Sequence, residues 1–144
     1  MNLGMIGAGL VMGISTIGSG VGIWVAGQSV VGAWKRCYVA NKPAPMLLLV
    51  FAAMPLSQTF YGFILMNQML TAVPLHPEKG LLYMALGVAA ALSNLFTAYA
   101  QGQISASAAD AQGETGKGFA QYISVIGISE SVSLFAMVFS MIAL

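Results

Sequence analysis

Residues 119–144 read FAQYISVIGISESVSLFAMVFSMIAL, an apolar run interrupted by a single acidic residue, Glu130. Glu130 lies about twelve residues from one end of this run and about fourteen from the other, so a helix crossing a bilayer would place its carboxylate near the midplane. A charge at that depth costs about 3 kcal/mol on insertion scales. Because such residues are functional by default, we expect Glu130 to have partners that offset this cost.

The composition of the whole chain excludes a soluble domain. Of its 144 residues, 58% are hydrophobic and 6% are charged, and the mean hydropathy is +0.85, whereas soluble domains carry about 25% charged residues. Five Lys and Arg residues cannot form a basic footprint, so no nucleic-acid partner is expected. A lone cysteine, Cys37, excludes an intramolecular disulfide, and with the lone His76 it supplies too few ligands for a structural zinc site.

Four apolar segments reach the roughly 20 residues that a transmembrane helix needs. They cover about residues 3–34, 46–71, 81–109 and 118–144. The first segment lacks a positive n-region and an A-x-A cleavage site before Lys35, so we expect a retained helix rather than a cleaved signal. We therefore predict an all-α membrane protein with four transmembrane helices.

The charges between these segments orient the predicted bundle. The segments 35–45 and 110–117 are predicted loops on one side of the membrane. Together they hold four basic residues: Lys35, Arg36, Lys42 and Lys117. The loop on the other side, which contains His76, holds only Lys79. The positive-inside rule then predicts a multi-pass protein of the cell membrane with loops 35–45 and 110–117 in the cytoplasm and both termini outside.

An internal repeat divides the chain into two helical hairpins, residues 1–72 and 73–144. Residues 56–63, LSQTFYGF, correspond to residues 128–135, ISESVSLF. A weaker correspondence relates GQSVVGA, which begins at Gly27, to GQISASA, which begins at Gly102.

Because both hairpins cross the membrane in the same sense, the duplication is parallel rather than inverted. Repeated hairpins of this kind favour a unit that stacks beside identical copies, and we predict a homo-oligomeric ring. Gln58 occupies the position that Glu130 holds in the second hairpin, so there is one carboxylate per four helices. A ring of given circumference then moves fewer ions per turn, which suits an ATP-driven pump.

Small residues on the first and third segments predict close helix packing. The first segment has Gly9 and Gly13, Gly18 and Gly22, and the seven-spaced series Gly13, Gly20 and Gly27; the third has Gly87, Ala91, Ser93 and Ala98. We expect these two helices to form an inner layer of the ring. Ordinary packing inside a monomeric bundle is the alternative.

Several polar residues share the predicted depth of Glu130. The second segment contains Ser57, Gln58 and Tyr61, which share one side of a helix. Pro55 has no amide hydrogen, so it bends the helix and leaves nearby carbonyls, including that of Met54, free to face a ligand. Gln101 on the third segment completes the set.

Each of these residues also has a purely structural interpretation. Pro55 could be only a kink, Tyr61 could pack, and Gln58 and Gln101 could hydrogen-bond between helices. Taken together, they are oxygen donors around one carboxylate, which suits a hard monovalent cation such as Na⁺. A site for H⁺ alone would need only the carboxylate, and the amides would be surplus.

The segments MPLSQTFYGF (54–63), AYAQGQ (98–103) and ISES (128–131) resemble the K subunit of bacterial V-type (V/A-type) rotary ATPases, the duplicated proteolipid of the rotor ring. The resemblance covers essentially the whole chain. It implies a Na⁺ site formed by the Met54 carbonyl, Ser57, Gln58, Gln101 and Glu130, with Tyr61 hydrogen-bonded to Glu130. Ser57 stands where relatives usually have Thr, but it keeps the hydroxyl.

The resemblance also implies a non-catalytic subunit within an ATP-hydrolysing complex. Its expected partners are identical subunits, membrane lipid, an Arg-bearing stator subunit of the a/I type, and a central-stalk subunit at the cytoplasmic loops. Three alternatives remain, of which the first two are the same ring carrying H⁺ and a small four-helix proton-coupled multidrug or cation exchanger. An ordinary structural membrane protein is a third.

Overall fold

The computed structural model describes residues 2–144, and every regular element in that range is helical. The elements are α1 (Leu3–Val39), α2 (Leu49–Ala53), α3 (Ser57–Ala72), α4 (Gly80–Thr115) and α5 (Phe119–Ile142). A short 3₁₀ turn at Met54–Leu56 joins α2 and α3 into one span, and others at Met46–Leu48 and Pro77–Lys79 precede α2 and α4. Four spans are thus long and apolar enough to cross a membrane, which confirms the predicted fold class.

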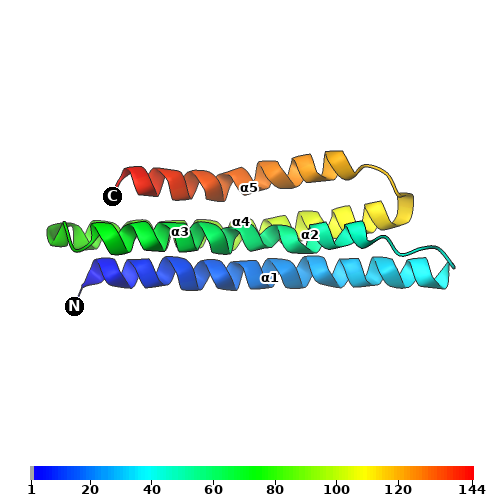
Figure 1. The fold of residues 1–144 in the computed structure, drawn as a ribbon, viewed down its shortest axis with the longest axis horizontal. Helices are drawn as coiled ribbons and strands as arrows, with labels where there is room; N and C mark the ends of the chain where they lie inside the picture. The colour runs from blue at the N-terminus through cyan, green and yellow to red at the C-terminus, as the bar shows by residue number, and fades with distance from the viewer. Residues whose placement is uncertain (1) are drawn as a thin grey trace.

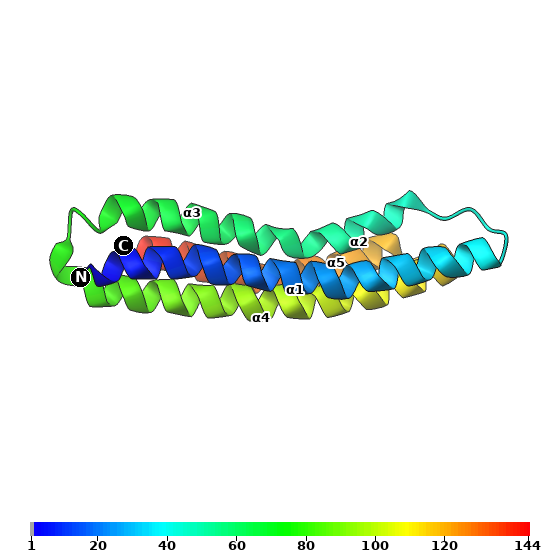
Figure 2. The same ribbon diagram turned by 90° about the horizontal axis from the view of Figure 1, so that it is seen from below.

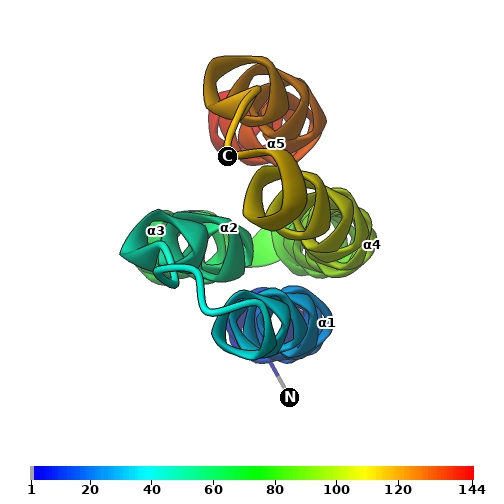
Figure 3. The same ribbon diagram turned by 90° about the vertical axis from the view of Figure 1, so that its right-hand side faces the viewer.

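The four spans run side by side along the long axis of the molecule (Figure 1). Both termini lie at one end, together with segment 73–76, and the two remaining connections lie at the other end. In the end-on view, α1, the α2–α3 span and α4 form a triangle, and α5 lies beyond α4, away from α1 (Figure 3). Helix α5 therefore lies at the edge of the chain and packs against α4 and α3.

Two predicted helix ends were wrong. Helix α1 continues to Val39 and α4 continues to Thr115, so residues 35–39 and 110–115 of the predicted loops are helical. Charged residues end the apolar span, but they do not break a helix. The helices end where the backbone cannot continue them: Asn41 and Gly116 adopt φ values of 52° and 68°, in the left-handed region, and Pro43 lies two residues after Asn41.

Glycine pairs bring α1 and α4 into backbone contact. Gly87 lies against Gly7, and Gly102 lies against Gly22. A Cβ atom added at Gly102 would lie 2.6 Å from the Cα of Gly22, a distance that real side chains do not tolerate. The predicted close packing between the first and third spans is therefore present within one chain.

Another set of glycines on α1 points into open space. Apart from the nearby backbone of α1 itself, no atom lies within 4 Å of a Cβ atom built at these positions, which are Gly9, Gly13, Gly20 and Gly27. The four share a face of the helix, since their spacings of four and seven residues return to one side. One face of α1 is thus used inside the chain, and a second small-residue face is left uncovered.

The core consists of two apolar clusters with a polar layer between them. One cluster, near the termini, includes Val11, Leu65 and Met69, and the other, near the far end, includes Phe51 and Ile126. Most of the buried polar side chains lie between them: Ser15, Ser19, Gln58, Asn94, Thr97, Gln101, Ser105 and Ser133. The polar layer is at the depth of Glu130, so the packing places the site at mid-span.

Replacement of Gly102 by Ala tests the backbone contact between α1 and α4. The methyl group would meet the backbone of Gly22, which cannot rotate away, so we expect Gly102→Ala to destabilise the chain by about 1–3 kcal/mol or more. Gly127→Ala on α5 is the matched control, because a Cβ there meets nothing within 4 Å. Thermal unfolding in detergent, followed by circular dichroism, should separate the two variants; equal midpoints would contradict the contact.

Candidate functional site

Glu130 is the twelfth of the 24 residues of α5 and is partly buried against α3 and α4. The hydroxyl of Tyr61, on α3, donates a hydrogen bond of 2.7 Å to Glu130 Oε1. Gln101 Nε2, on α4, lies 3.5 Å from Glu130 Oε2. Each carboxylate oxygen therefore meets one donor, and each donor comes from a different neighbouring helix. This arrangement fixes the direction in which the carboxylate points.

Two buried glutamines extend the network behind Glu130. Gln58 Nε2 donates to Gln101 Oε1 at 3.0 Å, and both side chains have no exposed surface. Ser57 Oγ lies 3.4 Å from Gln58 Oε1. Because an amide can present either its oxygen or its nitrogen, a half-turn of both side-chain amides would keep a hydrogen bond between Gln101 and Gln58 and would offer the Gln101 oxygen beside Glu130. The glutamines can thus serve an ionised carboxylate or a bound cation.

A bend in the second span supplies the backbone part of the site. The 3₁₀ turn Met54–Leu56 contains Pro55 and separates α2 from α3, which follow slightly different directions (Figure 2). The Met54 carbonyl accepts the amide of Ser57 and, at 3.1 Å, its hydroxyl. The turn therefore directs this carbonyl toward Ser57 and the neighbouring Gln58.

The six residues expected at the site form one connected group. Met54 contacts Ser57, Ser57 contacts Gln58, Gln58 contacts Gln101, and Gln101 and Tyr61 both contact Glu130. That these residues bind a cation stays a prediction, whereas their proximity is a property of the fold.

One residue of this neighbourhood was not expected from the sequence. Ser19 on α1 is buried, and its Oγ accepts a hydrogen bond of 3.1 Å from the backbone amide of Thr59. A second buried pair, Ser15 and Asn94, lies farther along α1 and α4, with Asn94 Nδ2 donating to Ser15 Oγ at 2.8 Å. Serines are common among small-residue helices, so only the spacing of three from Gly22 could have indicated that Ser19 faces the bend.

The donor set matches a singly charged cation better than a transition metal. Within residues 2–144 no three His, Cys, Asp or Glu side chains come close enough to share a metal ion. The group around Glu130 instead offers one carboxylate with amide, hydroxyl and carbonyl oxygens. Hard cations prefer oxygen ligands, and one carboxylate balances one positive charge.

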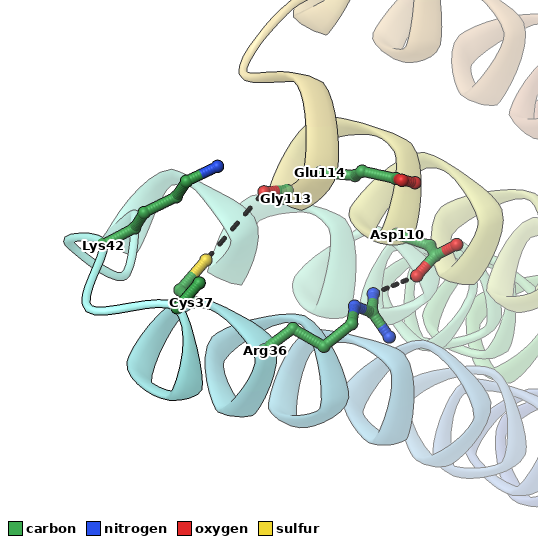
Figure 4. Close-up of a pocket in the computed structure, with 7 residues that line it drawn as sticks. Arg36, Cys37, Lys42, Asp110, Gly113 and Glu114 are labelled. Atoms are coloured by element: carbon green, nitrogen blue, oxygen red, sulfur yellow. Dashed lines mark hydrogen bonds and ion pairs between the residues drawn. The ribbon is translucent and has the colours of Figure 1, made fainter.

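A pocket at the far end of the bundle has a different character. There Arg36 on α1 forms an ion pair with Asp110 on α4, and Cys37 Sγ lies 3.9 Å from the Gly113 carbonyl (Figure 4). Lys42 and Glu114 also line this pocket, which therefore has both basic and acidic side chains. The ion pair is more than half exposed and contributes little stability. The pair links α1 to α4 beyond the apolar spans.

The sequence profile of the ATP synthase C-subunit family matches this chain twice, over residues 6–69 and 84–143. The chain belongs to the ATP synthase C-subunit family. Each match covers one of two successive helical hairpins, so this member of the C-subunit family is a duplicated hairpin protein.

The chain is also similar to the A-type ATP synthase subunit K of Methanocaldococcus jannaschii. The two sequences are 41% identical over 63 residues, which is 43% of this chain and 26% of the relative. The aligned region therefore spans about a quarter of the relative's length.

Removal of the Tyr61 hydroxyl tests whether it holds the Glu130 carboxylate. Hydrogen bonds to charged groups contribute about 1.5–3 kcal/mol, so we expect Tyr61→Phe to free the carboxylate and speed its modification by a carbodiimide about tenfold at fixed pH. Tyr83→Phe is the control, because Tyr83 donates to Leu144 instead. A modification rate equal to that of the unaltered chain would show that Tyr61 does not restrain Glu130.

Proposed function

We propose that this chain is a membrane rotor-ring subunit of a V-type rotary ATPase that binds Na⁺ at Glu130 and carries it across the membrane. The subunit itself is non-catalytic; rotation of its ring is coupled to ATP hydrolysis elsewhere in the complex. The observation that supports this most strongly is the carboxylate of Glu130 at mid-span, met by Tyr61 and Gln101 from two helices. Membership of the C-subunit family supports the ring.

In the proposed ring, α1 and α4 form the inner layer, and α3 and α5 form the outer layer. Helices α1 and α4 have the small residues that a tightly curved layer needs, including Gly22 and Gly102. The outer helices have large exposed apolar side chains suited to lipid, such as Phe60, Phe63, Phe135 and Phe139. This layout puts Glu130 between outer helices, where it can reach the edge of the ring.

Charge neutralisation explains how such a site could work. With Na⁺ bound, the net charge around Glu130 is zero, and the subunit can face lipid as the ring turns. Without the ion, the bare carboxylate is disfavoured in lipid. An Arg on the stator subunit would displace the ion by pairing with Glu130. Each charge moved across the membrane corresponds to about 2.3 kcal/mol per 100 mV.

The ends of the bundle indicate how the proposed ring is oriented. Lys35, Arg36, Lys42 and Lys117 lie at the end that holds the 40–45 and 116–118 connections, and Lys79 lies at the other end. The positive-inside rule puts the first end in the cytoplasm. There the extensions of α1 and α4 beyond the apolar spans, which the Arg36–Asp110 pair links, would contact a central stalk.

Buried amides favour Na⁺ over H⁺ as the transported ion. A proton needs only the carboxylate, yet Gln58 and Gln101 are both fully buried beside it. Burial of an amide is costly unless its polar atoms have partners. As ligands of Na⁺, the amide oxygens of Gln58 and Gln101 would join the carboxylate of Glu130, whereas a proton on Glu130 would use neither of them.

Protection of Glu130 by Na⁺ tests the choice of ion. At fixed pH we expect Na⁺ to slow carbodiimide modification of Glu130, and Gln58→Leu to raise the half-protecting Na⁺ concentration about tenfold, because one oxygen ligand is lost. Gln103→Leu is the matched control, since the side chain of Gln103 is exposed and bonds to Tyr99, away from Glu130. Absence of protection at high Na⁺ would favour the H⁺ ring instead.

Particle size separates the ring from a small exchanger. A purified ring should have a mass many times that of the 14.9 kDa chain and appear circular in projection images. An exchanger of this size would purify as a dimer. A dimeric particle in mild detergent would therefore contradict the rotor assignment.

A further inference from the structure

The amides at the start of α3 have unusual partners. The amides of the N-cap and of the first three residues of a helix have no acceptor within it, so those of residues 56–59 need partners elsewhere. The amide of Ser57 donates to Met54 O within the 3₁₀ turn. The amide of Thr59 donates across to another helix, to Ser19 Oγ on α1 at 3.1 Å. A side chain of α1 thus accepts a backbone hydrogen bond from the bend that contains Pro55.

Helix α1 also touches this bend at a second point. Gly22 lies three residues after Ser19 and so shares its face of the helix. A Cβ atom added at Gly22 would lie 2.6 Å from Pro55 Cβ, which shows that the proline ring rests directly on α1. Helix α1 therefore contacts the bend twice: Ser19 binds the amide of Thr59, and Gly22 packs against Pro55.

We infer that Ser19 is a positioning residue for the cation site: its hydroxyl keeps the turn at Met54–Leu56 in the 3₁₀ form that directs the Met54 carbonyl and Gln58 toward the ion. This inference rests on the proposed function. In a regular helix the amide of Thr59 would donate to the carbonyl four residues earlier, that of Pro55. Ser19 offers the amide an alternative acceptor, so the wider α-helical turn does not form there.

Loss of the hydroxyl should therefore change the site and leave the helices in place. In Ser19→Ala, the amide of Thr59 is left without an acceptor unless it turns toward Pro55, and that movement shifts the Met54 carbonyl and Gln58. The carbonyl would move relative to Glu130, whose own hydrogen bonds come from Tyr61 and Gln101. The expected result is weaker ion binding and an altered preference among ions of different size.

The experiment measures the concentrations of Na⁺ and of Li⁺ that half-protect Glu130 from a carbodiimide in purified rings of the full chain. We expect Ser19→Ala to raise the half-protecting Na⁺ concentration about fivefold, which corresponds to the free energy of about one hydrogen bond. We also expect the ratio of the half-protecting Na⁺ and Li⁺ concentrations to change. Ser15→Ala is the matched control. It removes another buried serine of α1, one turn away, whose partners are Val11 and Asn94 rather than the bend.

Ser19→Cys is a second variant in case Ser19→Ala does not fold. Cysteine is nearly isosteric with serine, but its sulfur is only a weak hydrogen-bond acceptor. Like Ser19→Ala, it should raise the Na⁺ concentration that half-protects Glu130. If the unaltered ring is protected and both Ser19 variants match Ser15→Ala, the inference is wrong and the Na⁺ site stands. If the unaltered ring is not protected by Na⁺, the proposed function fails and the inference fails with it.

Discussion

A carboxylate at the middle of an apolar span is the constraint on which the rest of this structure depends. Glu130 is tolerable in a membrane only if its charge meets donors or a cation. The fold meets this need by placing α5 at the edge of the chain while Tyr61 and Gln101 reach it from α3 and α4. In the proposed ring, the same edge position would keep the carboxylate near the lipid boundary, where ion exchange with a stator would take place.

Behind Glu130, the arrangement of the site depends on the close contact of α1 and α4. The pairs Gly7–Gly87 and Gly22–Gly102 let the two backbones touch. At the level of the second pair, the contact brings Pro55 onto α1 and places Gln101 beside Gln58. A larger side chain at Gly22 would thus disturb the helix packing and the bend together. The helix packing and the geometry of the site are coupled because both depend on the same few glycines.

Much of this could be predicted from the sequence, because membrane spans and charged residues within them obey strong rules. The four spans follow from apolar length, and the duplication and the shared depth of Gln58 and Glu130 follow from the repeat. Helical spacing and rise place Tyr61 and Gln101 near that depth. The helix ends did not follow, since charged residues end the apolar span and only Asn41, Pro43 and Gly116 end the helices. The contact of Ser19 could not be predicted from the sequence either, because it depends on which amide of a neighbouring helix lacks an acceptor.

The central claim is that each chain holds one monovalent cation at Glu130, and equilibrium binding of radioactive ²²Na⁺ to the purified ring tests it most directly. We expect one Na⁺ per chain at saturation, hence one per four helices, and none in Glu130→Gln. Two ions per chain would mean that the first hairpin, around Gln58, has a site of its own. No saturable binding, or binding that survives Glu130→Gln, would contradict the claim.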